Sequence, residues 1–138
     1  MGRQPPELNV LAKQAATERV CNVALLISEH ASGLQRFTGE GEALFAAYVD
    51  GALGGVGGVS REPWPGVDAM RMRRFYVSPR FRRAGVGRGL AGAAMQQGLQ
   101  AAPMLTLNAR ASAAAAPFGE ALGFDRDERH GWTHVFRP

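Results

Sequence analysis

The stretch MRMRRFYVSPRFRRAGVGRGL, residues 70–90, decides how this chain folds. Its first part has the period-two alternation of a β-strand. Met70 and Met72 share one face of that strand, but the next large apolar residues, Phe75 and Val77, have the opposite parity. One extra residue in the Arg-Arg step between them, a β-bulge, would place all four on one face. The alternative is an unbulged strand with both faces partly covered.

The second part of the stretch is a glycine- and arginine-rich loop that leads into a helix predicted over residues 86–101. Gly85 and Gly87 let the backbone approach a ligand closely. The free N–H groups and positive dipole end of the helix make an anion site. We therefore expect a phosphate-bearing ligand. Charge-assisted hydrogen bonds would come from Arg82, Arg83 and Arg88.

Upstream, helical spacing predicts helices over residues 7–19 and 20–32, although the second segment also fits a strand. The run EALFAAYVDGALGGVGGVSRE then predicts two strands joined by a type I′ turn at Asp50-Gly51. Its glycine-heavy second arm, LGGVGGV, indicates a bulge or the close approach of another chain segment.

Downstream, PMLTLNA from Pro103 predicts a strand, residues 112–122 a helix, and two extended pieces about Gly131 end the chain. The strand, helix and strand in the middle imply a right-handed parallel crossover next to an antiparallel hairpin. We therefore expect an α/β fold with a mixed sheet, in a single domain over residues 1–138.

Composition bounds the class of protein. A chain of 138 residues with 46% hydrophobic and 20% charged side chains suits one globular domain. It contains no apolar run of the roughly 20 residues that a membrane span needs. The start has no apolar region typical of a signal peptide, so the expected location is the cytoplasm. A single cysteine, Cys21, excludes an internal disulfide and a Cys-rich zinc site, and we expect it to be a buried small hydrophobe.

Charge points to an anionic ligand. The formal charge is +4, and seven of the fifteen arginines fall within residues 71–88. Residues 87–92 spell GxGxxG, but a nine-residue loop separates that motif from the strand and no acidic residue follows at the required distance. The chain has no GxxxxGK[ST] motif, which excludes a P-loop nucleotide hydrolase.

The strand and loop together resemble the acetyl-CoA loop of the GNAT superfamily of N-acetyltransferases. The family signature [RQ]xxGx[GA] follows a strand ending V-x-P, and here FYVSP at 75–79 precedes RRAGVG at 82–87. LTLNAR and APFGEALGF resemble the next strand and the closing helix of the family, so the likeness runs from about Ala43 to the C-terminus. It implies a mixed sheet with splayed parallel strands flanked by helices, acetyl-CoA as the acetyl donor, and a primary amine as the acceptor.

The resemblance also implies residue roles. The backbone of Phe75 to Val77 would pair with the pantetheine arm, and amides from Arg83 to Arg88 would hold the pyrophosphate. The bulge would aim a backbone N–H, that of Phe75 or its neighbour, at the thioester carbonyl. The expected acetyl-CoA contacts are Phe75, Tyr76, Val77, Arg82, Arg83, Ala84, Gly85, Val86, Gly87, Arg88, Asn108 and Ser112.

The sequence departs from the family at the proton donor. The tyrosine that usually protonates the departing thiolate falls at Gly119. A thiolate can leave without an acid, although an acid would raise the rate, and water, Ser112 or Tyr76 could substitute for the tyrosine. The alternative roles are a helix cap for Ser112 and strand packing for Tyr76. The family's first edge strand is also missing ahead of residues 7–19.

No carboxylate stands on the long strand where some members keep a base. Candidate bases are Glu42, Glu62, Asp68, His130 and His134, each also explained as a turn, strand-end or edge-strand residue. Trp64 and Trp132 are candidates for lining the acceptor pocket, or for core packing. No metal site is expected, because the histidines lack partners at ligand spacing.

Two other functions compete with the acetyltransferase. One is an acyl-CoA-binding module that has lost catalysis, as the missing tyrosine suggests. The other is a basic nucleic-acid-binding domain, disfavoured because no nucleic-acid motif or interleaved aromatic residues accompany the arginines. The expected partner is a small-molecule or protein amine rather than a membrane. Exposed strand edges are also compatible with a homodimer.

Overall fold

The computed structural model describes residues 5–82 and 84–138. Its helices are α1 (Leu8–Thr17), α2 (Asn22–Ser32), α3 (Val86–Ala101) and α4 (Ala115–Ala121), with 3₁₀ turns at Pro79–Phe81 and Ala109–Ala111. Its strands are β1 (Ala43–Val49), β2 (Ala52–Arg61), β3 (Met70–Val77), β4 (Leu105–Leu107), β5 (Asp125–Arg129) and β6 (Trp132–Phe136).

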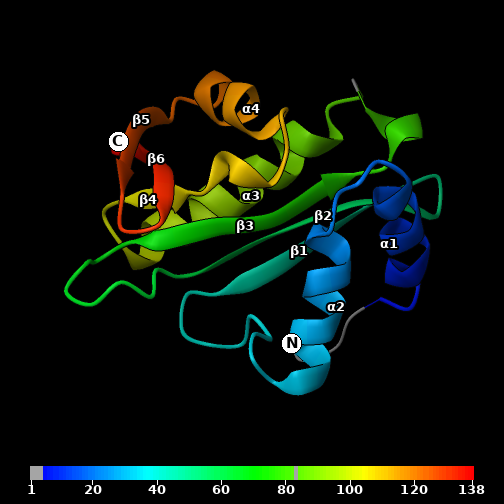
Figure 1. Ribbon diagram of the computed structural model, residues 1–138, viewed down its shortest axis with the longest axis horizontal. Coiled ribbons are helices and arrows are strands. Elements are labelled where there is room, and N and C mark those ends of the chain that lie inside the picture. The colour runs from blue at the N-terminus through cyan, green and yellow to red at the C-terminus, as the bar shows by residue number, and fades with distance from the viewer. Residues whose placement is uncertain (1–4, 83) are drawn as a thin grey trace.

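The six strands form one mixed sheet, as expected, in the order β1-β2-β3-β4-β6-β5. Among the strands of the described residues, β3 and β4 alone run parallel, and the crossover helix α3 joins them. Helices α1 and α2 lie on one side of the sheet and α3 and α4 on the other (Figure 1). Residues 20–32 are helical after residue 21 rather than a strand, and no strand precedes α1 among residues 5–7.

Three expectations need correction. The strand after Pro103 is only Leu105–Leu107, because the Asn108 side chain accepts a hydrogen bond from the Arg110 amide and turns the chain. The last helix starts at Ala115 rather than residue 112, after that turn. Cys21 is exposed at the start of α2 and is not a core residue.

The hairpin turn has the predicted type. Asp50 and Gly51 have φ angles of +50° and +82°, and two consecutive positive φ angles define a type I′ turn. Its two strands, β1 and β2, pair in antiparallel register from Ala43↔Val59 to Val49↔Ala52.

The predicted bulge in β3 is confirmed. Tyr76 pairs with Val56 and Arg73 with Gly58, so two residues of β3, Arg74 and Phe75, stand opposite Gly57. Arg74 has a φ of +64°, which L side chains rarely adopt. After the bulge, the Phe75 and Val77 side chains lie on the α3 side of the sheet with Met70 and Met72.

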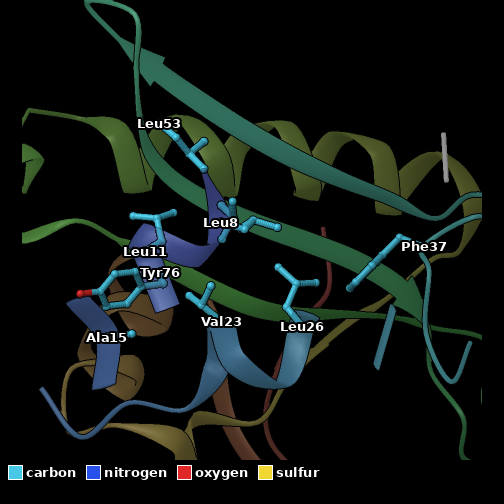
Figure 2. Close-up of a cluster of buried hydrophobic side chains, with 9 residues drawn as sticks. Leu8, Leu11, Ala15, Val23, Leu26, Phe37, Leu53 and Tyr76 are labelled. Atoms are coloured by element: carbon cyan, nitrogen blue, oxygen red, sulfur yellow. The ribbon is translucent and has the colours of Figure 1, made fainter. Parts of the chain in front are cut away.

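The glycines of β2 accept rings from both sides, as the close-approach interpretation predicted. The Phe75 ring covers the α position of Gly57. On the opposite face, a Cβ on Gly58 would lie 2.5 Å from the Phe37 ring. Phe37 is 4% exposed and belongs to the core beneath α1 and α2, with Leu8, Leu11 and Tyr76 (Figure 2).

This packing predicts that Gly58→Ala lowers the free energy of unfolding by about 1–3 kcal/mol, because the buried Phe37 ring must move. Gly92→Ala is the matched control. Gly92 is exposed on α3 with open space around its α position, so the control should gain up to about 1 kcal/mol from helix propensity. Urea denaturation measures both, and equal stabilities would contradict the packing.

Candidate active site

A cavity opens where β3 and β4 separate. The two strands pair only from Met70↔Leu105 to Met72↔Leu107 and then diverge. The space between them has a volume of about 980 Å³ and is bounded by β3, the α1–α2 junction, the loop into α3, and the segment from Leu107 to α4. Such a splayed pair is a groove into which an extended ligand arm fits.

The cavity brings together most of the site residues that the sequence singled out. Those on its wall are Phe75, Tyr76, Val77, Arg82, Gly85, Gly87, Arg88, Asn108 and Ser112. Ala84 is exposed beside it, and Val86 instead packs towards Gly55 of β2. Arg83 lies outside the described residues. The wall gives these residues a shared location, and their binding roles stay predictions.

The start of α3 forms the anionic-ligand end of the cavity. Gly85 caps the helix with a φ of +81°, the left-handed region that favours glycine. The Gly89 amide donates to the Gly85 carbonyl at 2.9 Å, which makes it the first amide with a partner inside the helix. The amides of Val86, Gly87 and Arg88 thus have no acceptor within the helix. Together with the helix dipole and the Arg88 side chain, they suit a pyrophosphate.

Glu18, at the end of α1, is a site residue that sequence reasoning missed. Its carboxylate accepts two hydrogen bonds from the Arg82 guanidinium, at 2.8 and 2.6 Å, and one from the Tyr76 hydroxyl at 2.5 Å. Hydrogen bonds from Arg82, and then from Tyr76, hold the pKa of Glu18 below its usual range. Arg82 also donates from Nε to the Val77 carbonyl at 3.1 Å, so its guanidinium is directed at α1 and β3.

The same contacts govern Tyr76. Burial, followed by the hydrogen bond to Glu18, raises the pKa of Tyr76 to about 12. Tyr76 is 6% exposed, and its ring lies in the core beneath α1 and α2 (Figure 2). A phenol that already donates to a carboxylate is a weak proton donor to anything else.

Two further ion pairs hold β3 from its α2 side. Glu29 of α2 accepts from Arg74 at 3.1 and 2.8 Å, which ties down the strained bulge residue. Glu62 accepts from Arg71 at 2.9 and 3.2 Å, and also from Thr106 at 2.8 Å. Both carboxylates are buried or nearly so.

The candidate bases lie away from the cavity. Glu42 accepts from the Gly39 and Arg61 amides, and Asp68 pairs with Arg61 at the surface. Glu62 is occupied as described, and none of the three belongs to the cavity wall.

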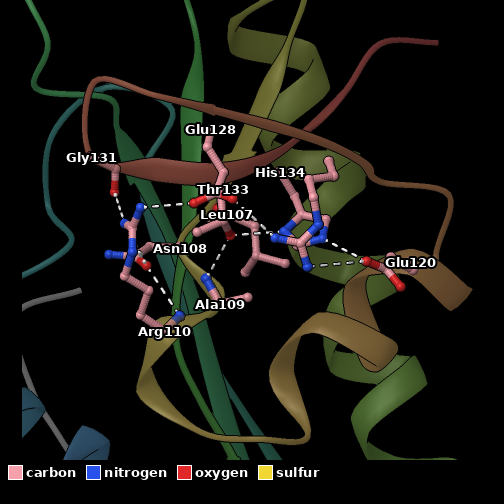
Figure 3. A network of polar contacts seen from close by, with 10 residues as sticks. Leu107, Asn108, Ala109, Arg110, Glu120, Glu128, Gly131, Thr133 and His134 are labelled. Atoms are coloured by element: carbon pink, nitrogen blue, oxygen red, sulfur yellow. Dashed lines mark hydrogen bonds and ion pairs between the residues drawn. The ribbon is translucent and has the colours of Figure 1, made fainter.

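The two histidines near the terminal hairpin also lie outside the cavity wall. His134 is fully buried between Thr133 and Glu120, at 2.7 and 2.8 Å (Figure 3). Thr133 in turn donates to the Leu107 carbonyl and accepts from the Ala109 amide, so this network fixes the end of β4. His130 stacks on Trp64 and contacts Trp132 edge-on.

Leu107 occupies the space beside the position where the resemblance expects a tyrosine. Gly119 is buried in α4, and any Cβ there would overlap the Leu107 side chain of β4. The neighbouring Phe118 is on the cavity wall instead, with its ring centroid 6.5 Å from that of Phe75. This position of α4 therefore carries no side chain that could donate a proton.

The described part of the chain contains no group of three or more His, Cys, Asp or Glu that could hold a metal ion. Within the same residues, no helix is long and apolar enough to span a membrane.

Comparisons with known proteins identify the family. The model of the acetyltransferase (GNAT) domain matches residues 12–134, so the chain belongs to the GNAT acetyltransferases, a family that uses acetyl-CoA. The fold is similar to that of a putative acetyltransferase from Exiguobacterium sp. 255-15, with 25% identity, 92% of this chain and 82% of that chain covered, and a TM-score of 0.76. No curated protein matches.

Two further solved structures share the fold. A GNAT-family acetyltransferase from Staphylococcus aureus Mu50 is 12% identical, with 99% of this chain and 96% of that chain covered and a TM-score of 0.73. An aminoglycoside N-acetyltransferase in complex with CoA is 23% identical, with 79% and 87% covered and a TM-score of 0.61.

The Glu18 cluster predicts a pH-dependent contribution to stability. Because the pKa of Glu18 is lowered in the folded state, its contribution is present above the unfolded value of about 4.3 and is lost as the pH falls through the folded value. Glu18→Gln should therefore unfold at a lower temperature than wild type at about pH 6, and the difference should shrink towards about pH 3. Asp68→Asn, which breaks an exposed pair, is the control and should change little at either pH. A pH-independent Glu18→Gln deficit would contradict the account.

Proposed function

We propose that this protein transfers the acetyl group of acetyl-CoA directly to a primary amine, with both substrates held in the cavity between β3 and β4. The observation that supports this most is the bulge in β3 beside the splay, within one continuous cavity that reaches the start of α3. The pantetheine arm would lie in the gap, and the pyrophosphate would lie at the amides of α3. The thioester supplies the activated acetyl group.

Strand parity supports this use of β3. Neighbouring residues of a strand direct their backbone groups to opposite edges. The Ser78 amide donates to Gly54 on the β2 side. The Val77 and Phe75 carbonyls instead accept from the Arg82 and Asn22 side chains, on the side away from β2. The backbone groups of Phe75 and Val77 are therefore directed at the gap, where an added strand-like ligand would pair with them.

The Phe75 N–H is the proposed donor to the thioester oxygen. As the amine nitrogen forms its bond to the acetyl carbon, negative charge grows on that oxygen, and one preorganised donor lowers the barrier by about 3 kcal/mol. The C–S bond then breaks. The amine loses a proton to water, and the departing CoA thiolate gains one.

Ser112 or a water molecule is the proposed source of the thiolate proton. Ser112 lies on the cavity wall between the Ala109–Ala111 turn and α4. Tyr76 is the other candidate from the sequence, but its hydroxyl donates a hydrogen bond to Glu18 and its pKa is raised to about 12. These contacts favour a role for Tyr76 in positioning Arg82 and the loop that follows β3. We keep the cytoplasm as the proposed location, where acetyl-CoA is available.

An acyl-CoA-binding module without catalysis is the second candidate. Gly119 favours it, because the family's usual acid is missing there and any side chain at that position would have to displace the end of the Leu107 side chain. The nucleic-acid alternative loses support, because Arg71 and Arg74 are paired with Glu62 and Glu29 rather than displayed on a surface.

Thermal unfolding with acetyl-CoA and with free CoA tests cofactor binding. Either ligand at 100 times its Kd should stabilise the protein by about 2.7 kcal/mol. Arg88→Glu should keep the fold, because an acidic residue suits the first turn of α3, yet lose most of that stabilisation. Arg137→Glu makes the same charge change outside the cavity wall and should respond like wild type. No shift at millimolar ligand with folded protein would exclude the proposal.

Two substitutions of Arg74 test the bulge. Arg74→Gly and Arg74→Val both remove the ion pair to Glu29, but only glycine favours the observed φ of +64°. We expect Arg74→Val to lose about a hundredfold or more in kcat relative to Arg74→Gly, because the Phe75 amide is no longer aimed. The measurement is the rate at which CoA thiol is released, either in the presence of an amine that the enzyme accepts or, without one, through slow hydrolysis of acetyl-CoA. Equal rates would show that the bulge does not position the donor.

A further inference from the structure

Arg73 of β3 is a largely buried cation whose hydrogen bonds are incomplete. Its side chain is 20% exposed and borders the cavity. Nη1 lies 3.5 Å from the Ser60 hydroxyl, at the limit of a hydrogen bond, and Nη2 lies 3.9 Å from Glu29. Its Nε is buried with no hydrogen-bond partner among the described residues.

The charges around Arg73 do not balance it. Glu29 forms its close bidentate pair with Arg74, and Glu62 forms its own with Arg71. Glu42 also acts on Arg73, but only at longer range, because its carboxylate accepts from the Gly39 and Arg61 amides. Of the three guanidinium groups, Arg73 is therefore the one without a close bidentate carboxylate. Burial, and then the nearby Arg74, lower the pKa of Arg73, which Glu29 and Glu42 only partly offset. Burying a charge without a full partner is costly, so the site favours an anion that completes it.

Arg73 also stands where an acceptor would enter. It follows Met72, the last residue of β3 to pair with β4, and lies two positions before Phe75. The anion site at α3 and the Phe75 side chain lie on the other side of the sheet. An acceptor amine approaching the thioester from the side opposite the cofactor loop would pass the Arg73 guanidinium.

We propose that Arg73 binds a carboxylate of the acceptor, so that the substrate is a small amino acid whose amine is acetylated. This inference rests on the proposed function. The single positive charge of Arg73 matches a monoanionic carboxylate better than a phosphate dianion. A free amino acid is favoured over a protein terminus because the Arg73 side chain is four-fifths buried and the carboxylate must enter the cavity to reach it.

Matched pairs of amines test this substrate class. CoA thiol release is measured for each of five amino acids and for the corresponding α-carboxamide: glycine, L-alanine, L-methionine, L-phenylalanine and L-glutamate. Spermidine is included as a cationic amine. For the accepted side chain, we expect kcat/KM to be about tenfold to a hundredfold higher for the acid than for its amide. The amine of an amino-acid amide is less basic than that of the free acid, so more of it is present as the neutral nucleophile. Amine reactivity alone would therefore favour the amide over the acid.

Variants assign the preference to Arg73. Arg73→Gln should bring the acid-to-amide ratio to within about threefold, mainly through KM for the amine, and Arg73→Lys should keep part of the ratio. Arg61→Gln, which removes an exposed arginine from the neighbouring strand β2, should leave the ratio unchanged. Arg73→Gln should also unfold no earlier than wild type, whereas a structural arginine would cost stability when removed.

The outcomes separate the two proposals. If CoA does not stabilise the protein, the acetyltransferase proposal fails. If CoA stabilises the protein but the amides or spermidine react as well as the acids, the Arg73 inference is overturned and the proposed function stands. The same conclusion follows if none of the acids reacts and none raises the unfolding temperature of the CoA complex. An unchanged ratio in Arg73→Gln overturns it as well.

Discussion

The bulge at Arg74 and Phe75 is the constraint on which the rest of the site depends. It places Phe75 and Val77 on the same side as Met70 and Met72, so the strand keeps one apolar face towards α3 and α4. It lies just past Met72, the last residue of β3 that pairs with β4. A regular strand would have reversed those faces and directed different backbone groups at the gap.

The bulge is held from both sides of the sheet. Gly57 has no side chain, which lets the Phe75 ring lie over it. From the other side, Glu29 pairs with Arg74, and the Asn22 amide donates to the Phe75 carbonyl at 3.3 Å. The α1–α2 segment therefore does more than cover the sheet. Side chains of α2 bind β3, and Glu18 binds Arg82 in the loop that follows β3.

Much of this arrangement could be predicted from the sequence, because short stretches of neighbouring residues determine it. The parity change between Met72 and Phe75 predicted the bulge, Asp50-Gly51 predicted the turn, and the glycines of β2 predicted close approach. The run from Arg82 to Gly87 predicted the loop ahead of α3. Each signal depends on a few consecutive residues whose backbone options are narrow.

What the sequence could not supply were contacts between distant residues. Glu18 and Arg82 are 64 positions apart and Glu29 and Arg74 are 45 apart, and no local pattern pairs one carboxylate with one arginine. Cys21 was misplaced because burial statistics ignore its position in an exposed turn. The orphaned Nε of Arg73 becomes visible only after Glu29 and Glu62 are assigned to the other arginines.

The central claim is that the Phe75 amide faces the thioester carbonyl. Amide NMR during titration with acetyl-CoA and, separately, with free CoA tests it most directly, since the two ligands differ only in the acetyl group. We expect both ligands to shift the amides at the start of α3 equally, while acetyl-CoA alone shifts the Phe75 amide strongly. Identical spectra at Phe75 with both ligands would contradict it.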